Sequence, residues 1–86
     1  MIFTKKFLVA KIEEKTNVNL YTLLDLDNYD KLTTIGIKSD DVKEREVVEA
    51  KIRISFKRLS FKDDKQGQVW VDVADTFVVD IRRDNA

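Results

Sequence analysis

The 86-residue sequence contains no cysteine, no histidine and no proline, and only two of its residues are glycine. Without cysteine the chain has no disulfide framework and no thiolate metal site. Without histidine it lacks the commonest general base and metal ligand. The remaining carboxylate, lysine and hydroxyl groups follow no catalytic or ligand spacing, so we expect a protein that is not an enzyme and that uses no cofactor and no metal.

Long apolar runs and a net charge are also missing. No stretch approaches the roughly 18–20 apolar residues of a membrane span, and no signal segment opens the chain, so we expect a cytoplasmic protein. Basic and acidic residues number 16 each, which argues against a protein that coats nucleic acid through net charge. A single domain over 1–86, with a frayed tail at 82–86, buries only about 60–65% of its unfolded surface, and this favours an oligomer.

Residues 47–62 form the clearest pattern in the sequence. From Val48 to Phe56 every second residue is apolar, which is the period of a strand with one buried and one solvent-exposed face. At Lys57 and Arg58 the apolar residues change from even to odd positions, which predicts a β-bulge within one long strand. The exposed face is basic and contains no acid between its members, which are Lys51, Arg53, Lys57, Arg58 and Lys62.

Four further strands are predicted, over residues 1–15, 18–27, 32–38 and 68–81. Gly36 predicts a bend or bulge, and Asp75 interrupts the apolar positions of the last strand and predicts a kink. Residues 39–46 are predicted to be a loop with room for a helical turn, and 62–68 a hairpin loop. This order of elements predicts an all-β fold, a small five-stranded barrel of the oligonucleotide/oligosaccharide-binding type (OB-fold) with a long hairpin.

The strand over 18–27 carries apolar side chains on both faces. The residues predicted to face the core are Val18, Leu20, Leu24 and Leu26. Tyr21 and Leu23 then lie on the exposed face, and Trp70 lies opposite the buried set of the last strand. Such side chains are either platforms on which bases stack, or surfaces covered by the other half of the barrel or by a partner subunit.

The basic face of the strand over 47–62 also has two interpretations. Its lysines and arginines either follow a phosphate backbone across the barrel, or form the solvated face of an edge strand, where lysine prevents pairing with another edge.

From Asn19-Leu20-Tyr21-Thr22-Leu23 onward, over about residues 18–81, the chain resembles the small single-stranded-DNA-binding (helix-destabilising) proteins of filamentous phages. The resemblance rests on a Tyr-x-Leu at Tyr21 and Leu23, a turn at 25–28, a Ser-Phe-Lys at 55–57 or 60–62, a hairpin tip with glycine and a valine-rich last strand. Those proteins are dimeric OB-fold barrels whose Tyr-x-Leu side chains contact DNA, so the resemblance implies the same role for Tyr21 and Leu23. The family's arginine-bearing loop and aromatic hairpin tip are replaced here by 13–17 and 63–67.

We therefore predict a non-catalytic single-stranded-DNA-binding protein that assists the replication or transfer of a phage or mobile element. The alternative is a protein–protein interaction module or a small dimeric structural protein. The residues expected to bind DNA are Tyr21, Leu23, Lys51, Arg53, Lys57, Arg58 and Trp70. A homodimer is expected through the hairpin over 55–75, whose strands outrun a small barrel and whose exposed apolar residues include Leu59, Phe61, Val69 and Val71.

Overall fold

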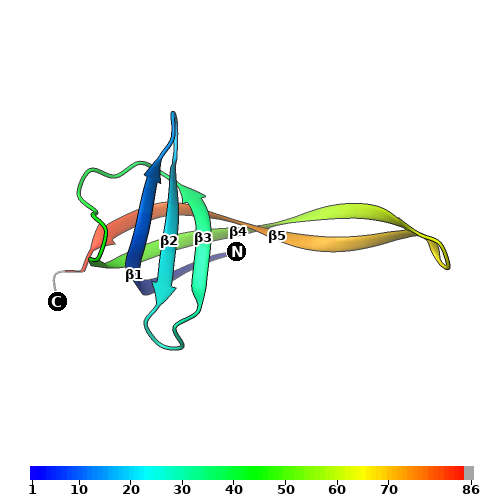
Figure 1. The fold of residues 1–86 in the computed structure, drawn as a ribbon, viewed down its shortest axis with the longest axis horizontal. Helices are drawn as coiled ribbons and strands as arrows, with labels where there is room; N and C mark the ends of the chain where they lie inside the picture. The colour runs from blue at the N-terminus through cyan, green and yellow to red at the C-terminus, as the bar shows by residue number, and fades with distance from the viewer. Residues whose placement is uncertain (85–86) are drawn as a thin grey trace.

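The computed structural model describes residues 1–84, and within them the chain forms five strands and no helix. The strands close into a barrel in the order β1-β2-β3-β5-β4, with β4 and β5 extending far beyond it as a hairpin (Figure 1). The prediction of an all-β, five-stranded barrel of OB-like type is confirmed. The strand bounds are β1 Ile2–Glu14, β2 Asn19–Asp25, β3 Lys31–Gly36, β4 Val47–Asp63 and β5 Gly67–Arg83.

All strand pairs are antiparallel except β3 with β5, which runs parallel over only two residue pairs, Ile35↔Phe77 and Gly36↔Val78. Gly36 permits this contact, because a Cβ atom at this position would clash with Val78 and lie 2.9 Å from its carbonyl oxygen. The amide of Ile37 adds a hydrogen bond of 3.0 Å to the same oxygen. Gly36 therefore marks the point where the barrel closes, rather than a bend within β3.

The long hairpin has no irregularity where the sequence predicted one. The β4–β5 register is continuous from Ile52↔Val78 to Asp63↔Gly67, and its shift falls between Lys51 and Ile52, where Val79 is the extra residue of β5. The predicted bulge at 57–58 and the predicted kink at Asp75 are therefore wrong. At 57–58 the apolar residues of β4 change from even to odd positions because the hairpin has left the barrel. Beyond the barrel there is no core to require apolar residues on one particular face of the strand.

Within residues 1–84 the core contains ten buried apolar side chains, contributed by the inward faces of the strands and by one loop residue. They are Phe7, Val9, Tyr21, Leu23, Val42, Val48, Ala50, Ile52, Val78 and Ile81. Tyr21 and Leu23 are completely buried, so the prediction that they lie on the exposed face of β2 is wrong. Because β2 is apolar on both faces, its sequence did not determine which face turns inward.

Burial of Tyr21 is possible because its hydroxyl has partners inside the protein. The hydroxyl donates a hydrogen bond of 2.5 Å to the carbonyl oxygen of Ile37 and accepts one of 3.3 Å from the amide of Asn19. The odd-numbered residues of β2 thus fill the barrel, whereas Leu20 and Leu24 are only half-buried on its outer surface. Leu24 lies directly opposite Leu8 of β1 there.

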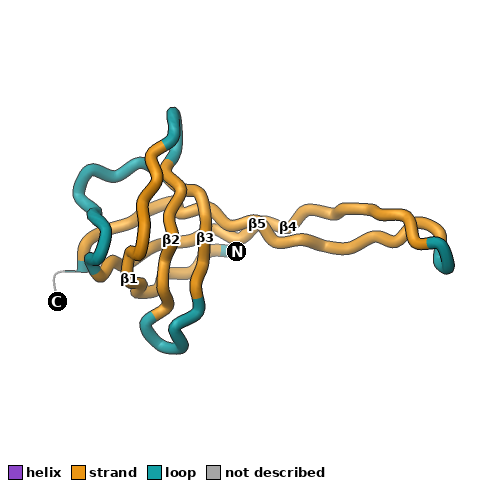
Figure 2. Tube along the Cα trace, in the orientation of Figure 1, coloured by secondary structure: helices purple, strands orange, loops and turns teal. Residues whose placement is uncertain are grey.

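Figure 2 shows the loops that join β1 to β2, β2 to β3 and β3 to β4, and the last of these packs against the barrel. The loop after β3 contains no helical turn, and it buries Val42 in the core. It is fastened to β1 by two backbone hydrogen bonds, from Arg45 to the Val9 carbonyl at 2.6 Å and from Val9 to the Glu46 carbonyl at 2.9 Å. The segment 39–46 therefore acts as an ordered cover of the core.

The chain end differs from the predicted frayed tail. Arg82 and Arg83 belong to β5 and pair with Glu49 and Val48 of β4. The amide of Asp84 continues this pairing with a hydrogen bond of 2.9 Å to Val47. The remainder of the predicted tail, 85–86, lies outside the described residues.

Beyond Ile54 and Thr76 the two long strands pair only with each other, and we call residues 55–75 the ribbon. The ribbon projects from the barrel, and the molecule measures 53 × 31 × 21 Å as a result (Figure 1). Among residues 1–84 there is no helix that is long and apolar enough to cross a membrane.

Candidate functional site

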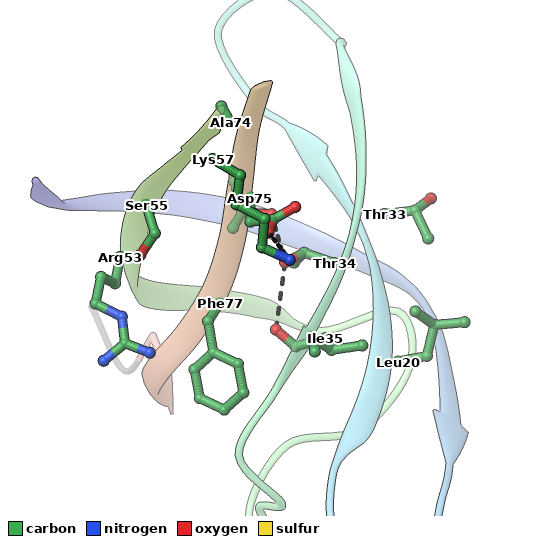
Figure 3. A pocket seen from close by; sticks show the side chains of 11 residues that line it. Leu20, Thr33, Thr34, Ile35, Arg53, Ser55, Lys57, Ala74, Asp75 and Phe77 are labelled. Atoms are coloured by element: carbon green, nitrogen blue, oxygen red, sulfur yellow. Dashed lines mark hydrogen bonds and ion pairs between the residues drawn. The ribbon is translucent and has the colours of Figure 1, made fainter. Parts of the chain in front are cut away.

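A groove lies where the ribbon leaves the barrel, between the base of the ribbon and the outer surface of β2 and β3 (Figure 3). Its volume of about 620 Å³ is within the range of small-ligand sites. The groove opens here because β3 and β5 pair over two residues and then diverge. It is lined by Leu20, Thr33, Thr34, Ile35, Arg53, Ser55, Lys57, Ala74, Asp75, Thr76 and Phe77.

Arg53 and Phe77 form one wall of the groove. They are cross-strand partners, and the guanidinium carbon of Arg53 lies 5.6 Å from the centre of the Phe77 ring, within cation–π distance. Leu20 and Thr33 lie on the opposite side, with Ile35 between the two walls (Figure 3). The groove thus presents planar, apolar and cationic surfaces side by side.

The floor of the groove is a hydrogen-bonded pair of threonines. The hydroxyl of Thr76 donates to the hydroxyl oxygen of Thr34 at 2.6 Å, and Thr34 donates to the carbonyl oxygen of Ile35 at 3.2 Å. This pair links β3 to β5 just beyond the last backbone pairing of the two strands. The two walls are therefore held at a fixed separation.

Lys57 contributes the second cation of the groove. Its ammonium nitrogen lies 2.7 Å from the carboxylate of Asp75, and this hydrogen bond raises the pKa of Lys57. Lys57 is therefore protonated at neutral pH, with part of its charge balanced by Asp75. Its side chain is 66% exposed, so the pair adds little to stability, although the cation remains accessible to an anion.

The predicted basic face is divided between separate surfaces. Lys51, Arg53 and Lys57 share one face of β4, but Lys51 lies outside the groove in a shallow depression with Glu49 and Asp80. Arg58 falls on the opposite face of the ribbon because no bulge intervenes after Lys57. The prediction of one continuous basic face is therefore wrong, and only Arg53 and Lys57 enter the groove.

Arg58 and Trp70 meet on that opposite face. The guanidinium carbon of Arg58 lies 5.9 Å from the centre of the Trp70 ring, and Trp70 is 55% exposed, so within the described chain no other part of the barrel covers it. Phe56 is exposed on the same face of the ribbon. These residues form a second, smaller surface on which cation and aromatic rings are combined.

Tyr21 and Leu23 belong to neither surface. Both side chains are fully buried and offer no area on which a base could stack. Burial also raises the pKa of the Tyr21 hydroxyl, because the surrounding apolar side chains disfavour the phenolate. The Tyr-x-Leu that the resemblance linked to DNA contact is therefore a core element in this chain.

Of the residues that line the groove, the sequence analysis identified only Arg53 and Lys57, and the large apolar residues that it missed are Leu20, Ile35 and Phe77. Phe77 shares its parity with Ile81 in the sequence, but the extra residue Val79 turns it outward while Ile81 stays buried. No glycine or proline marks this bulge. Ile35 carried the clearest available signal, because it alternates with the small inward residues Thr34 and Gly36 in a short strand.

Comparison with protein-family models gives no match, and neither the curated proteins nor the solved structures include one that matches this chain.

Proposed function

We propose that this protein binds single-stranded DNA in the groove between the ribbon and β2–β3, without catalysing a reaction. The observation that carries the proposal is the Arg53–Phe77 pair facing the apolar side chains of Leu20 and Ile35 across an open groove. In five-stranded barrels of this architecture, the face of strands 2 and 3 is where oligonucleotides bind.

The proposed binding combines stacking with phosphate contacts. Phe77 provides a surface on which a base stacks, and each stacked base contributes about 1–3 kcal/mol. Arg53, beside the Phe77 ring, and Lys57, at the ribbon end of the groove, contact phosphates. Since backbone contacts and stacking carry no base code, the binding tolerates any sequence. A role in replication or transfer of a phage or mobile element accords with such tolerance.

The small number of cations sets the expected salt dependence. Two phosphate contacts, from Arg53 and Lys57, correspond to a slope of about −1.4 in a plot of log affinity against log salt, at about −0.7 per phosphate on a single strand. Affinity is therefore modest at physiological salt and rises in low salt.

The test is titration of fluorescent oligo-dT at two salt concentrations. Arg53→Ala is expected to weaken binding and flatten the slope by about 0.7. Phe77→Ala is expected to weaken binding by about 1–3 kcal/mol with the slope nearly unchanged, since stacking releases no counterions. Lys43→Ala is the matched control, because it removes the same charge from the loop at the barrel end. Absence of binding by the wild type in low salt would refute the proposal.

A second candidate function, protein–protein interaction, is favoured by the composition of the ribbon. Its four basic residues are matched by four acidic ones, so it has no net charge with which to attract DNA. The bases are Lys57, Arg58, Lys62 and Lys65, and the acids are Asp63, Asp64, Asp72 and Asp75. Its exposed apolar side chains instead suit a protein partner.

A further inference from the structure

The two faces of the ribbon differ in chemistry. The register pairs odd-numbered residues of β4 with odd-numbered residues of β5, so the odd-numbered side chains lie on one face and the even-numbered ones on the other. We call each directly opposed pair of residues a row. The odd-numbered face carries five apolar side chains in three successive rows, and we call it the apolar face. These side chains are Val73 beside Lys57, Leu59 with Val71, and Phe61 with Val69.

The apolar face has no cover within the described chain. Leu59 is 50% exposed and Phe61 52%, and no residue of the ribbon is buried. A two-stranded hairpin is at best marginally stable in water and requires packing on one face. A contiguous apolar patch of this kind marks an interaction site.

Charges at the two ends of the apolar face are arranged symmetrically about its centre. The row of Leu59 and Val71 and the row of Phe61 and Val69 lie on either side of the level of Ser60. Counted from Ser60, Lys57 lies three residues towards the barrel, and Asp63, the last residue of β4, lies three residues towards the tip. Asp75 pairs with Ser55, five residues from Ser60 towards the barrel, and Lys65 lies five residues from Ser60 towards the tip.

We propose that the apolar face packs against the same face of a second copy of this chain, antiparallel about a two-fold axis at the level of Ser60. In this arrangement Leu59 and Val71 of one copy contact Phe61 and Val69 of the other. Lys57 then lies opposite the partner's Asp63, and Asp75 lies opposite the partner's Lys65. A two-fold interface must be self-complementary, and the opposite charges at mirrored positions provide this.

The size of the ribbon limits the strength of this association. Ten residues per strand at about 3.3 Å each give a length of about 30 Å. Contact between two such ribbons buries less area than the roughly 1,200 Å² at which specific interfaces begin to be strong. We therefore expect a dimer that dissociates at micromolar concentrations. Its formation requires no DNA, but Lys57 and Asp75 line the groove as well, so the dimer and the proposed phosphate contact of Lys57 compete for the ribbon end of the groove.

The first test is analytical ultracentrifugation of the full chain without nucleic acid, over a series of concentrations. The wild type is expected to pass from monomer to dimer. Val71→Glu buries a charge against the partner's Val69, close to the second introduced carboxylate across the axis, and is expected to weaken the dimer at least 100-fold. Ser60→Glu is the matched control, because it adds the same charge at the same level on the opposite face, and it is expected to leave the dimer intact.

The second test determines the orientation. Asp63→Lys is expected to weaken the antiparallel dimer two- to fivefold in low salt, since it opposes Lys57 of the partner, and high salt is expected to remove the difference. In a parallel arrangement position 63 would face itself, so reversing its charge would change nothing. An unchanged dimer for Asp63→Lys would thus overturn the antiparallel packing.

Two further outcomes would overturn the interface itself. A monomer at every concentration would show that no second copy covers the apolar face. A dimer that resists Val71→Glu would place the contact elsewhere, for example along the free strand edges. Because these measurements contain no oligo-dT, the absence of a dimer can be distinguished from the absence of DNA binding.

Discussion

The barrel and the ribbon share two strands, β4 and β5, but the apolar residues of these strands are buried in the barrel and exposed in the ribbon. In the barrel, Val48, Ala50 and Ile52 of β4 are completely buried by the other four strands. A few residues further along the same strand, Phe56, Leu59 and Phe61 are each at least half exposed. Identical alternation therefore has different consequences, because burial depends on what lies opposite each face and not on the strand's own pattern.

This difference predicts that stability is located in the barrel and association in the ribbon. The barrel has a continuous core, closed hydrogen bonding around its circumference and a loop that buries Val42 in the core. The ribbon has only the pairing between its own two strands. Substitutions in the two regions should therefore change different measurable quantities.

The largest expected effect is that of Tyr21→Ala. Removing this fully buried ring is expected to lower the free energy of unfolding by about 3–5 kcal/mol, as seen for large aromatic-to-alanine changes in cores. Phe61→Ala, the equivalent truncation in the ribbon, is expected to change it by no more than about 0.5 kcal/mol in dilute monomer. Urea denaturation of both variants measures the contrast. Equal losses would mean that the ribbon is part of the cooperative fold.

The strand that contains Tyr21 also shows where sequence information ended. The alternation of apolar and polar residues predicted the strands and their approximate bounds, and the order of these strands predicted a small five-stranded barrel. The inward face of β2 did not, because Leu20, Tyr21, Leu23 and Leu24 offer apolar side chains on both faces. What selects the inward face is a contact distant in sequence, the hydrogen bond from Tyr21 to Ile37.

The groove was only partly predictable for a related reason. Arg53 and Lys57 were recognised from the basic positions of β4, but Phe77 depends on a bulge at Val79 that no residue type marks. The division of the basic residues between two faces depends on the same register. A one-residue shift reverses every side chain beyond it, so errors in register become errors in the site.

The second largest expected effect concerns the closure of the barrel. Gly36→Ala places a Cβ against the backbone of Val78 and is expected to destabilise the protein by about 1–3 kcal/mol. Hydrogen exchange of the Ile37 amide, which bonds to Val78, is expected to accelerate most. Gly67→Ala at the ribbon tip has open space around it and strains only its own turn, so it should leave exchange in the barrel unchanged. If the Ile37 amide stays protected in Gly36→Ala, the closing contact is less tight than the structure indicates.

A smaller, pH-dependent effect is expected from Asp25. Its carboxylate lies 2.6 Å from the ammonium of Lys5, and this hydrogen bond, with a second one from the Asp27 amide, lowers the pKa of Asp25 in the folded protein. The unfolded chain therefore binds the proton more readily as the pH falls. The stabilisation is present above the pKa of the unfolded state and is lost as the pH drops through that of the folded state.

Thermal unfolding at a series of pH values measures this contribution. Asp25→Asn is expected to lower the melting temperature at pH 7 and to flatten its fall in acid, so that variant and wild type converge at low pH. Asp64→Asn, which removes a carboxylate from the ribbon tip, is the control and should preserve the acid response. A wild-type pH profile in Asp25→Asn would show that other carboxylates determine it.

The smallest expected effect is that of dimer formation on the fluorescence of Trp70, which should hardly change. Trp70 is the single tryptophan of the chain and lies on the even-numbered face of the ribbon, opposite the apolar face. Because its indole is 55% exposed, its emission is expected to be that of a solvated ring. Burial of the apolar face in a dimer leaves that environment unchanged, so emission should be the same at concentrations where sedimentation gives monomer and where it gives dimer. A blue shift that tracks dimer formation would instead place the interface on the face of Trp70 and Arg58, and would exchange the roles assigned to the two faces of the ribbon.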